Sequence, residues 1–278
     1  MAPGFVMPSK PAEAIAPAWE SRLQPAMEPR RSLLIVNPNT STPITGTIEA
    51  RVRAQLGDRF TLRTTTAEFG FRYIASRSGV AVAGHAVLDA VAKALASGGR
   101  PDAILLACFG DPGFDALSEA CDIPVVAFAE AGLQAAAALP GAFIVATRGA
   151  VWREVILELA QKLGVAGKLA GIETIDHLAD DAAQIADFLA ARAQDAGAER
   201  VLIGGAGLIP TLGAIAAASR VPVLDAHRAA IDKAARWAEA GNRPDRPRPA
   251  AAKVDGVSSQ LEQLLAASGL ALPAGPGG

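Results

Sequence analysis

The sequence predicts an α/β protein of two similar Rossmann-like lobes, each a parallel sheet flanked by helices, with the active-site cleft between them. Short, continuously apolar segments alternate with longer segments of helical periodicity, which is typical of parallel strands that are buried on both faces. The same order of segments recurs in the second half of the chain at low sequence identity. The 278 residues, of which 51% are hydrophobic, suffice for two lobes of roughly 100 residues each.

The first half of the chain contains three predicted strands. The first predicted strand is the run 33–36, which an Asn-Pro-Asn turn ends. A hydroxyl residue at 40–42 then caps a helix whose apolar positions are Ile48, Val52 and Leu56. The remaining predicted elements of this half are, in order, a helix at 81–95, a strand at 102–107, a short helix ending at 121 and a strand at 124–128.

The second half repeats this layout. Its predicted elements are, in order, a strand at 143–146, helices at 151–163 and 182–196, strands at 201–203 and 222–224, and a helix at 226–240. Parallel sheets bind ligands at the carboxyl ends of their strands. Two lobes placed face to face would therefore bring the loops after Val36, Ala107, Ala146 and Ile203 around one cleft.

Pro-rich segments set the expected domain boundaries. Repeated prolines predict a disordered N-terminal tail at 1–30. Lobe 1 is expected at 31–138, joined by the helix at 226–240, and lobe 2 at 139–225. The segment 241–278 is predicted to be a Pro-rich linker and a mobile C-terminal tail, with one short amphipathic helix from 258 to 267.

Composition excludes several classes of protein. Lys and Arg number 26 against 28 Asp and Glu, with no basic run, so a nucleic-acid partner is not expected. No run approaches the roughly 20 uninterrupted apolar residues that span a bilayer, and no secretory signal is evident, so we expect a cytoplasmic protein without a membrane partner. Two cysteines and three histidines are too few, and too far apart, for a structural zinc site. We therefore expect a small-molecule partner and no metal; the sequence leaves a homo-oligomer open.

Cys108 is the best candidate for an acid/base or a nucleophile. It ends a buried strand and precedes a turn whose free backbone N–H groups face it, and such a place favours a thiolate or the anionic group of a ligand. The alternative is that Cys108 is simply a small core side chain. Cys121 closes a helix on the far side of the layer and is interpreted as structural. A disulfide between the two is not expected, because a helix would separate them by more than roughly 7 Å.

Polar residues gather at other predicted strand ends. At the first strand end, donors and acceptors crowd together and suit a substrate carboxylate, although the same residues also form an ordinary turn and helix cap. These candidates are Asn37, Asn39, Thr40 and Ser41. Thr147 ends another strand. Backbone N–H groups of the Gly-rich turn 204–207 approach whatever fills the cleft, but Pro210 stands where a dinucleotide fingerprint needs a glycine. This turn therefore does not match a dinucleotide-binding fingerprint.

Four segments together resemble the Asp/Glu/hydantoin racemase superfamily, and within it the hydantoin and allantoin racemase branch. They are LLIVNPNTS at 33–41, LLACFGDPG at 105–113, PVVAFAEA at 124–131 and LIGGAGL at 202–208. The resemblance covers roughly 32–240. It implies cofactor-independent chemistry in which two cysteines, one per lobe, flank a carbon acid.

Cys108 matches the first-lobe cysteine of that pattern, and the same resemblance marks Phe109 and Gly110 as substrate-binding residues. Where the racemases have Gly-Cys-Ala-Gly, this chain has Gly204-Gly205-Ala206-Gly207, so the second thiol is missing. In the related arylmalonate decarboxylases the single cysteine comes from the other lobe. Gly205, Ala206 and Gly207 remain candidates for substrate contact through their backbone.

The sequence therefore predicts a cofactor-independent isomerase that exchanges a proton at the alpha carbon of a small carboxylate, amino acid or hydantoin-like cyclic amide, with Cys108 as the acid/base. Two-thiol racemisation is excluded, because Gly205 has no side chain to serve as the second acid or base. One alternative is a single-cysteine decarboxylase or a maleate-type cis-trans isomerase. A second alternative is a small-carboxylate binding protein without activity.

Overall fold

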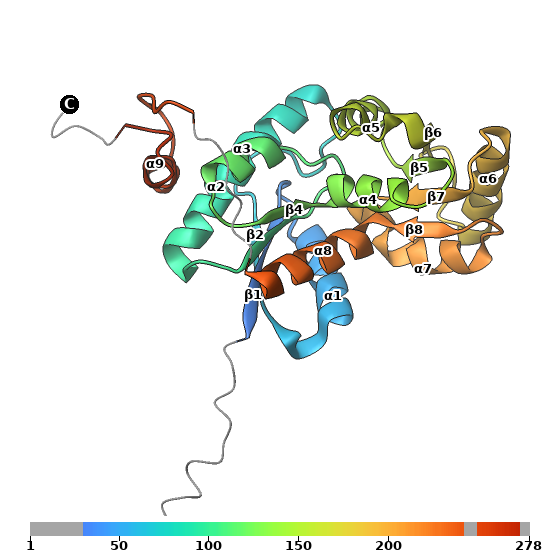
Figure 1. The fold of residues 1–278 in the computed structure, drawn as a ribbon, viewed down its shortest axis with the longest axis horizontal. Helices are drawn as coiled ribbons and strands as arrows, with labels where there is room; N and C mark the ends of the chain where they lie inside the picture. Colours follow the sequence, from blue (N-terminus) through green and yellow to red (C-terminus); the bar gives the residue numbers. More distant parts are fainter. Residues whose placement is uncertain (1–29, 242–248, 273–278) are drawn as a thin grey trace, which may run out of the picture. The chain divides into compact units, whose positions relative to one another are not determined.

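The computed structural model describes residues 30–241 and 249–272, and these form an α/β fold with two separate parallel sheets (Figure 1). Each sheet has four strands. The first has the order β2-β1-β3-β4 and the second the order β6-β5-β7-β8. The strands are β1 (Arg31–Asn37), β2 (Phe60–Thr66), β3 (Ala103–Leu106), β4 (Val125–Ala127), β5 (Phe143–Thr147), β6 (Leu169–Thr174), β7 (Arg200–Ile203) and β8 (Val223–Asp225).

The central strands explain the apolar runs of the sequence. In the first sheet Leu33 of β1 pairs with Leu62 of β2 and with Ala103 of β3. In the second sheet Val145 of β5 takes the same central place, between β6 and β7. These strands are buried on both faces by helices, which is why their sequences are apolar without alternation. The predicted two-lobed fold class is confirmed.

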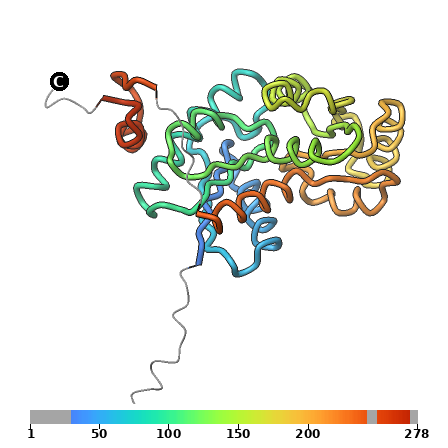
Figure 2. The backbone as a smooth tube through the Cα atoms, in the orientation of Figure 1, coloured from blue at the N-terminus to red at the C-terminus, as the bar shows by residue number. Residues whose placement is uncertain are grey.

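Helices cover both faces of each sheet (Figure 2). The helices that follow strands of the first sheet are α1 (Thr42–Leu56), α2 (Arg77–Gly98), α3 (Phe114–Ala120) and α4 (Phe128–Ala137). Those of the second half are α5 (Val151–Lys162), α6 (Ala182–Asp195), α7 (Ile209–Ala218), α8 (Ala226–Ala240) and α9 (Ser259–Ala267). Short 3-10 turns are η2 (Gly57–Arg59), η3 (Ala166–Lys168) and η4 (Ala206–Leu208). Strands β2 and β6 and helices α4 and α7 were not expected from the sequence.

The two sheets share one hydrophobic core. A single cluster of buried side chains contains Leu33 of the first sheet, Phe143 of the second, and Phe109 from the loop after β3. Helix α8 follows the second sheet, yet it packs against β1, β3 and β4 of the first and against α4. These contacts support the prediction that this helix joins lobe 1. The lobe boundaries at 31–138 and 139–225 stay predictions.

At the C-terminal end, α9 packs against α2 and corresponds to the short helix expected at 258–267. Leu261 is buried with 2% of its surface exposed, and the Ser258 hydroxyl contacts the carboxylate of Asp89 on α2. The predicted mobility of the segment 241–278 stays a prediction. The expected tail at 1–30 lies outside the described residues except for Arg30, and so do residues 242–248 and 273–278.

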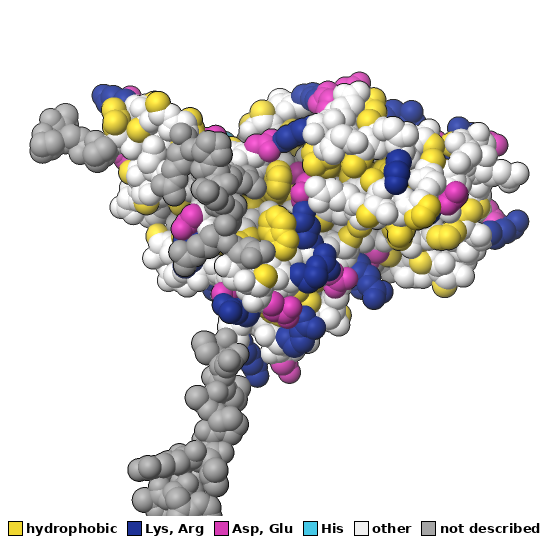
Figure 3. Space-filling model, in the orientation of Figure 1, with side chains coloured by type: hydrophobic (Ala, Val, Ile, Leu, Met, Phe, Trp, Pro, Cys, Tyr) yellow, Lys and Arg dark blue, Asp and Glu magenta, His cyan; other side chains and the backbone are white. Residues whose placement is uncertain are grey.

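Helix α2 is the one helix among the described residues that is long and apolar enough to cross a membrane, by length and composition only. A core helix of a globular protein passes the same test, and α2 places Val87 and Val91 in the core. On the face shown in Figure 3, basic and acidic side chains are interspersed. That distribution agrees with the near balance of charges in the sequence.

Candidate active site

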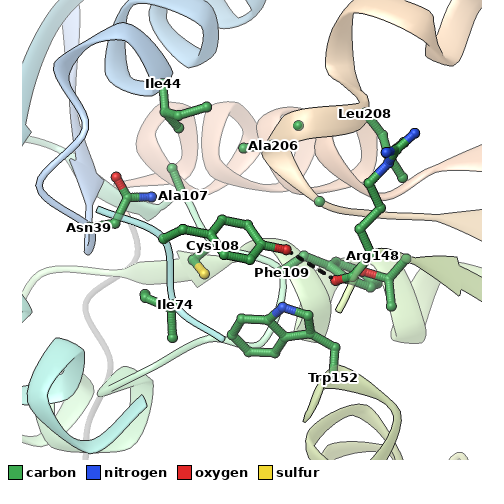
Figure 4. Close-up of a pocket in the computed structure, with 14 residues that line it drawn as sticks. Asn39, Ile44, Ile74, Ala107, Cys108, Phe109, Arg148, Trp152, Ala206 and Leu208 are labelled. Atoms are coloured by element: carbon green, nitrogen blue, oxygen red, sulfur yellow. Dashed lines mark hydrogen bonds between the residues drawn. The ribbon is translucent and has the colours of Figure 1, made fainter. Parts of the chain in front are cut away.

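The loops after β1, β3, β5 and β7 meet at a cavity of about 180 Å³ between the two sheets (Figure 4). Its walls therefore come from both lobes, at the strand ends where the sequence placed the cleft. The lining residues are Asn39, Ile44, Tyr73, Ile74, Ala107, Cys108, Phe109, Thr147, Arg148, Trp152, Gly205, Ala206, Gly207 and Leu208.

The first strand end is built around Asn37, which is completely buried. Its amide nitrogen donates to Asn39 Oδ1 at 3.0 Å, to the Ser41 carbonyl at 3.1 Å and to Thr45 Oγ1 at 2.9 Å. The amide N–H groups of Asn37 are therefore used within the turn and the start of α1, and Asn37 does not line the cavity. Thr40 does not line it either; its backbone N–H donates to the Phe71 carbonyl at 3.0 Å and so anchors the loop before α2.

Asn39 is the polar group that this turn presents to the cavity. Its Oδ1 accepts hydrogen bonds from Asn37 and from the backbone N–H of Ser41, which fixes the orientation of the amide. Its Nδ2 has no partner among the described residues and faces the cavity in Figure 4. Ser41 is the N-cap residue of α1 and lies outside the lining. Substrate contact thus stays a prediction for three residues that do not line the cavity, namely Asn37, Thr40 and Ser41.

Cys108 follows β3 and lines the cavity with its side chain partly buried. Both Cys108 and Cys121 are free thiols. Burial raises the pKa of the Cys108 thiol far above its usual range, and the nearby Asp111 carboxylate adds to that effect. The unliganded site therefore favours the neutral thiol and not the thiolate that the sequence led us to expect.

Asp111 adds to the effect of burial on Cys108. Its carboxylate, and not the sulfur, takes the backbone donors at the start of α4, accepting from Ala129 N at 2.9 Å and from Glu130 N at 2.6 Å. Burial raises the pKa of Asp111 to about 7, although these hydrogen bonds oppose the shift. Near neutral pH the carboxylate thus carries a partial negative charge close to Cys108, and that charge disfavours a thiolate.

On the second lobe, Gly205 faces open space. A Cβ built at this position would approach only Thr147 Oγ1, at 3.6 Å. The backbone φ of Gly205 is 118°, a conformation that L side chains rarely adopt. The structure therefore has room for the missing thiol beside Thr147, but the local backbone suits glycine.

Aromatic side chains close the cavity across the two lobes. A Cβ on Gly110 would lie 2.1 Å from the Trp152 ring of α5, so this glycine lets the indole pack directly on the loop after β3. Trp152 is 5% exposed and Phe109 is 3% exposed. Gly110 itself does not line the cavity; its role here is to admit Trp152. Its predicted contact with substrate stays a prediction.

Sequence reasoning missed several lining residues, namely Ile44, Tyr73, Ile74, Ala107, Arg148, Trp152 and Leu208. The apolar ones carry no signal that separates a cavity wall from a core. Arg148 directly follows Thr147 at a strand end, and that position could have marked it. Tyr73 is 58% exposed, and its hydroxyl donates to the Arg148 carbonyl at 3.5 Å, the dashed line in Figure 4. Burial of the hydroxyl end and the nearby Asp176 raise the pKa of Tyr73, so it is a neutral donor.

Comparison with known proteins decides the family. The sequence profile of the Asp/Glu/Hydantoin racemase family matches residues 33–234, which hold both sheets and the whole cavity. The chain belongs to this racemase family. Membership covers the four segments in which the sequence resembles it, and the C-terminal helix α9 lies outside the match.

Individual proteins similar to this chain include hydantoin racemases and allantoin racemases. It is 28% identical over 206 residues to a hydantoin racemase of Paenarthrobacter aurescens, covering 71% of this chain and 87% of that protein. A hydantoin racemase of Pseudomonas sp. strain NS671 is 27% identical over 200 residues, covering 69% and 79%. The crystal structure of an allantoin racemase from Pseudomonas fluorescens superposes with a TM-score of 0.74 at 25% identity, covering 81% of this chain and all of that one. The protein is thus a racemase-family enzyme.

Proposed function

We propose that this racemase-family enzyme exchanges the proton at the alpha carbon of a small carboxylate, amino acid or hydantoin-like cyclic amide without a cofactor, using Cys108 as the acid/base. The observation that carries the proposal is the position of Cys108: a free thiol in the wall of the inter-lobe cavity, at the carboxyl end of β3. The similarity to hydantoin racemases supports the substrate class.

The proposed step involves the Cys108 sulfur, the alpha carbon and an adjacent carbonyl. The thiolate takes the alpha proton, so the C–H bond breaks, an S–H bond forms, and the electron pair moves onto the carbonyl oxygen to give an enolate. The free Asn39 amide N–H is a donor that can stabilise that oxygen. Returning a proton from sulfur after exchange with water restores the substrate with solvent hydrogen on the same face.

Inversion needs a proton from the opposite face, where the family pattern has a cysteine and this chain has Gly205. Thr147 Oγ1 is the side-chain atom nearest to that position, and a solvent water is the other acid that this face requires. We therefore expect exchange at the alpha carbon to be faster than inversion of configuration.

A test follows the alpha hydrogen directly. Single enantiomers of aspartate, glutamate, 5-substituted hydantoins and allantoin are incubated with the enzyme in deuterium oxide, and deuterium uptake and configuration are measured. Uptake into at least one compound is expected, and Cys108→Ala should slow it at least about 100-fold. Cys121→Ala is the matched control, because Cys121 lies in a separate core cluster away from the cavity. Unchanged exchange in the Cys108 variant would end the proposal.

The raised pKa of Cys108 also predicts a pH dependence. Below the thiol pKa the reactive thiolate fraction grows about tenfold per pH unit, so the rate of exchange at low substrate concentration should climb steadily from pH 6 to pH 9. A rate that is flat over this range would contradict a Cys108 thiolate as the base. Initial rates of deuterium uptake in buffers of constant ionic strength provide the measurement.

A lyase is the second candidate function, and the neutral thiol together with Gly205 favours it. A protonated Cys108 suits a reaction in which carbon dioxide leaves and the thiol then protonates the carbanion on one face. That reaction needs the thiol as an acid, so its rate should be flat with pH up to the thiol pKa. Carbon dioxide release from a disubstituted malonate would favour this candidate. Conversion of maleate to fumarate would instead indicate a cis-trans isomerase, in which the Cys108 thiolate adds to the double bond and leaves again after rotation.

Ligand-induced melting shifts without any turnover would instead favour a binding protein. A cytoplasmic location, a homo-oligomer and the absence of nucleic-acid or membrane partners stay predictions.

A further inference from the structure

Arg148 is the one formally charged residue among the described residues that line the cavity. It follows the last residue of β5, and in Figure 4 its side chain extends along the cavity wall toward Leu208. The side chain is 27% exposed. A cation is thus part of the wall of the cavity that holds Cys108, and within 30–241 and 249–272 no carboxylate lines that wall.

The hydrogen bonds of this guanidinium are incomplete. One terminal nitrogen pairs with Asp180, whose side chain is 74% exposed and lies on the solvent side. Arg148 Nε is buried and has no hydrogen-bond partner among the described residues. A buried, unpaired donor on a charged group is costly, and a ligand that supplies an acceptor removes that cost.

The backbone around Arg148 is held in place from two sides. The Arg148 carbonyl accepts the Tyr73 hydroxyl at 3.5 Å, and the next backbone N–H, that of Gly149, donates to both carboxylate oxygens of Asp176 at 2.9 and 2.7 Å. Asp176 and Asp180 both belong to the loop before α6, outside the cavity lining. Asp180 pairs with the guanidinium and Asp176 with the adjacent backbone N–H, and neither takes a hydrogen bond from Arg148 Nε.

We propose that Arg148 is a specificity-determining residue that binds a carboxylate carried by the substrate, in addition to the group that Cys108 deprotonates. The planar guanidinium matches a carboxylate, and a charge-assisted hydrogen bond is stronger than one to a neutral carbonyl. The same cavity is lined by the apolar side chains of Ile74, Trp152 and Leu208, which limit the water inside it and strengthen the interaction. This inference rests on the proposed function, because it names the substrate class of the same site.

The two ends of the cavity then bind different groups of the substrate. In Figure 4 Asn39 and Arg148 lie on opposite sides of the drawn cavity, with Cys108 between them. The Asn39 amide donor suits the carbonyl next to the reacting carbon, and Arg148 suits an anionic substituent. A hydantoin whose 5-substituent ends in a carboxylate satisfies both, whereas one with an alkyl substituent leaves the Arg148 donor unpaired.

The test compares two ligands of nearly equal shape, 5-(carboxymethyl)hydantoin and its carboxamide. Their affinities are measured by calorimetry and their alpha-proton exchange by NMR in deuterium oxide. The unmodified enzyme should bind the carboxylate at least about tenfold more tightly. Arg148→Met should weaken carboxylate binding about 10- to 100-fold and change carboxamide binding less than about threefold. The affinity of the Arg148→Lys variant for the carboxylate compound should lie between those of the unmodified enzyme and the Arg148→Met variant. Arg153→Met, which removes an exposed arginine of α5, is the matched control and should leave the affinities for both compounds unchanged.

The outcomes separate the inference from the proposed function. Selective binding of the carboxylate compound that depends on Arg148 supports the inference. If neither compound exchanges its alpha proton, that counts against the proposed reaction but leaves the inference about Arg148 in place. Equal affinity for the two compounds, equal weakening of both by Arg148→Met, or no binding of the carboxylate would overturn the inference. Proton exchange with equal KM for both compounds would overturn it while leaving the reaction in place.

Discussion

At the scale of single residues, Asp111 combines burial with an uncommon backbone. It is 7% exposed, its φ of 51° lies in the left-handed region, and its carboxylate accepts two backbone donors from α4. Such a conformation in a residue other than glycine costs about 1–3 kcal/mol and persists where surrounding contacts hold it. The two hydrogen bonds to α4 are those contacts.

The raised pKa of Asp111 predicts a specific dependence of stability on pH. The folded protein holds this proton up to about pH 7, whereas an unfolded chain releases it near pH 3.8. The stability that protonation contributes is therefore complete below pH 4 and is lost as the pH rises through 7. Relative to Asp111→Asn, which does not titrate, the free energy of unfolding should fall by up to about 4 kcal/mol from pH 4 to pH 8. Urea unfolding of both proteins measures this, and a constant difference across pH would contradict it.

Gly205 offers the complementary test of the missing thiol. Gly205→Cys should lower the free energy of unfolding by about 1–3 kcal/mol, because φ of 118° strains any L side chain. It should also raise the rate of inversion relative to same-face exchange, because a thiol then faces the cavity beside Thr147. Gly205→Ala carries the same strain without the thiol and is the control. Chiral chromatography measures the rate of inversion in both variants. Equal rates would contradict the role assigned to this position.

At the scale of elements, α9 is an addition outside the family match that shields part of α2. Leu261→Ala should lower the free energy of unfolding by about 2–4 kcal/mol, because the side chain is 2% exposed and leaves a cavity. Gln263→Ala, at an exposed position of the same helix, should change it by less than about 0.5 kcal/mol. Proton exchange should be unaffected in both variants, because α9 contributes nothing to the cavity lining.

Each element that the sequence patterns did not predict lacks a local signal for a physical reason. Strands β2 and β6 are edge strands, and most of their side chains are only half-buried, so they lack the continuous apolar run of β1 or β5. Helix α4 begins at Phe128 directly after β4, so no turn residue separates strand from helix. Helix α7 carries Pro210 in its first turn and few polar residues, and therefore lacks a clear amphipathic period.

At the scale of the whole molecule, the packing of Trp152 on Gly110 joins a helix of the second half to a loop of the first. Gly110→Ala would place a methyl group 2.1 Å from the indole and must displace it. We expect a loss of about 1–3 kcal/mol in the free energy of unfolding and at least a tenfold loss of proton exchange. Gly46→Ala in α1 is the matched control: nothing lies within 4 Å of its added methyl, so stability should rise slightly. Activity retained in the Gly110 variant would show that Trp152 does not shape the site.

The sequence by itself determined the repeated α/β architecture, the central strands, the position of Cys108 at a strand end and the absence of a second thiol at Gly205. These follow from local patterns, because buried parallel strands and their terminal residues are visible in short segments. Only the tertiary structure decided that Asp111 takes the backbone donors near Cys108 and that Arg148 and Trp152 join Cys108 and Asn39 in the lining of one cavity. Such contacts join residues far apart along the chain, and their donors, charges and burial are set by packing that no short segment encodes.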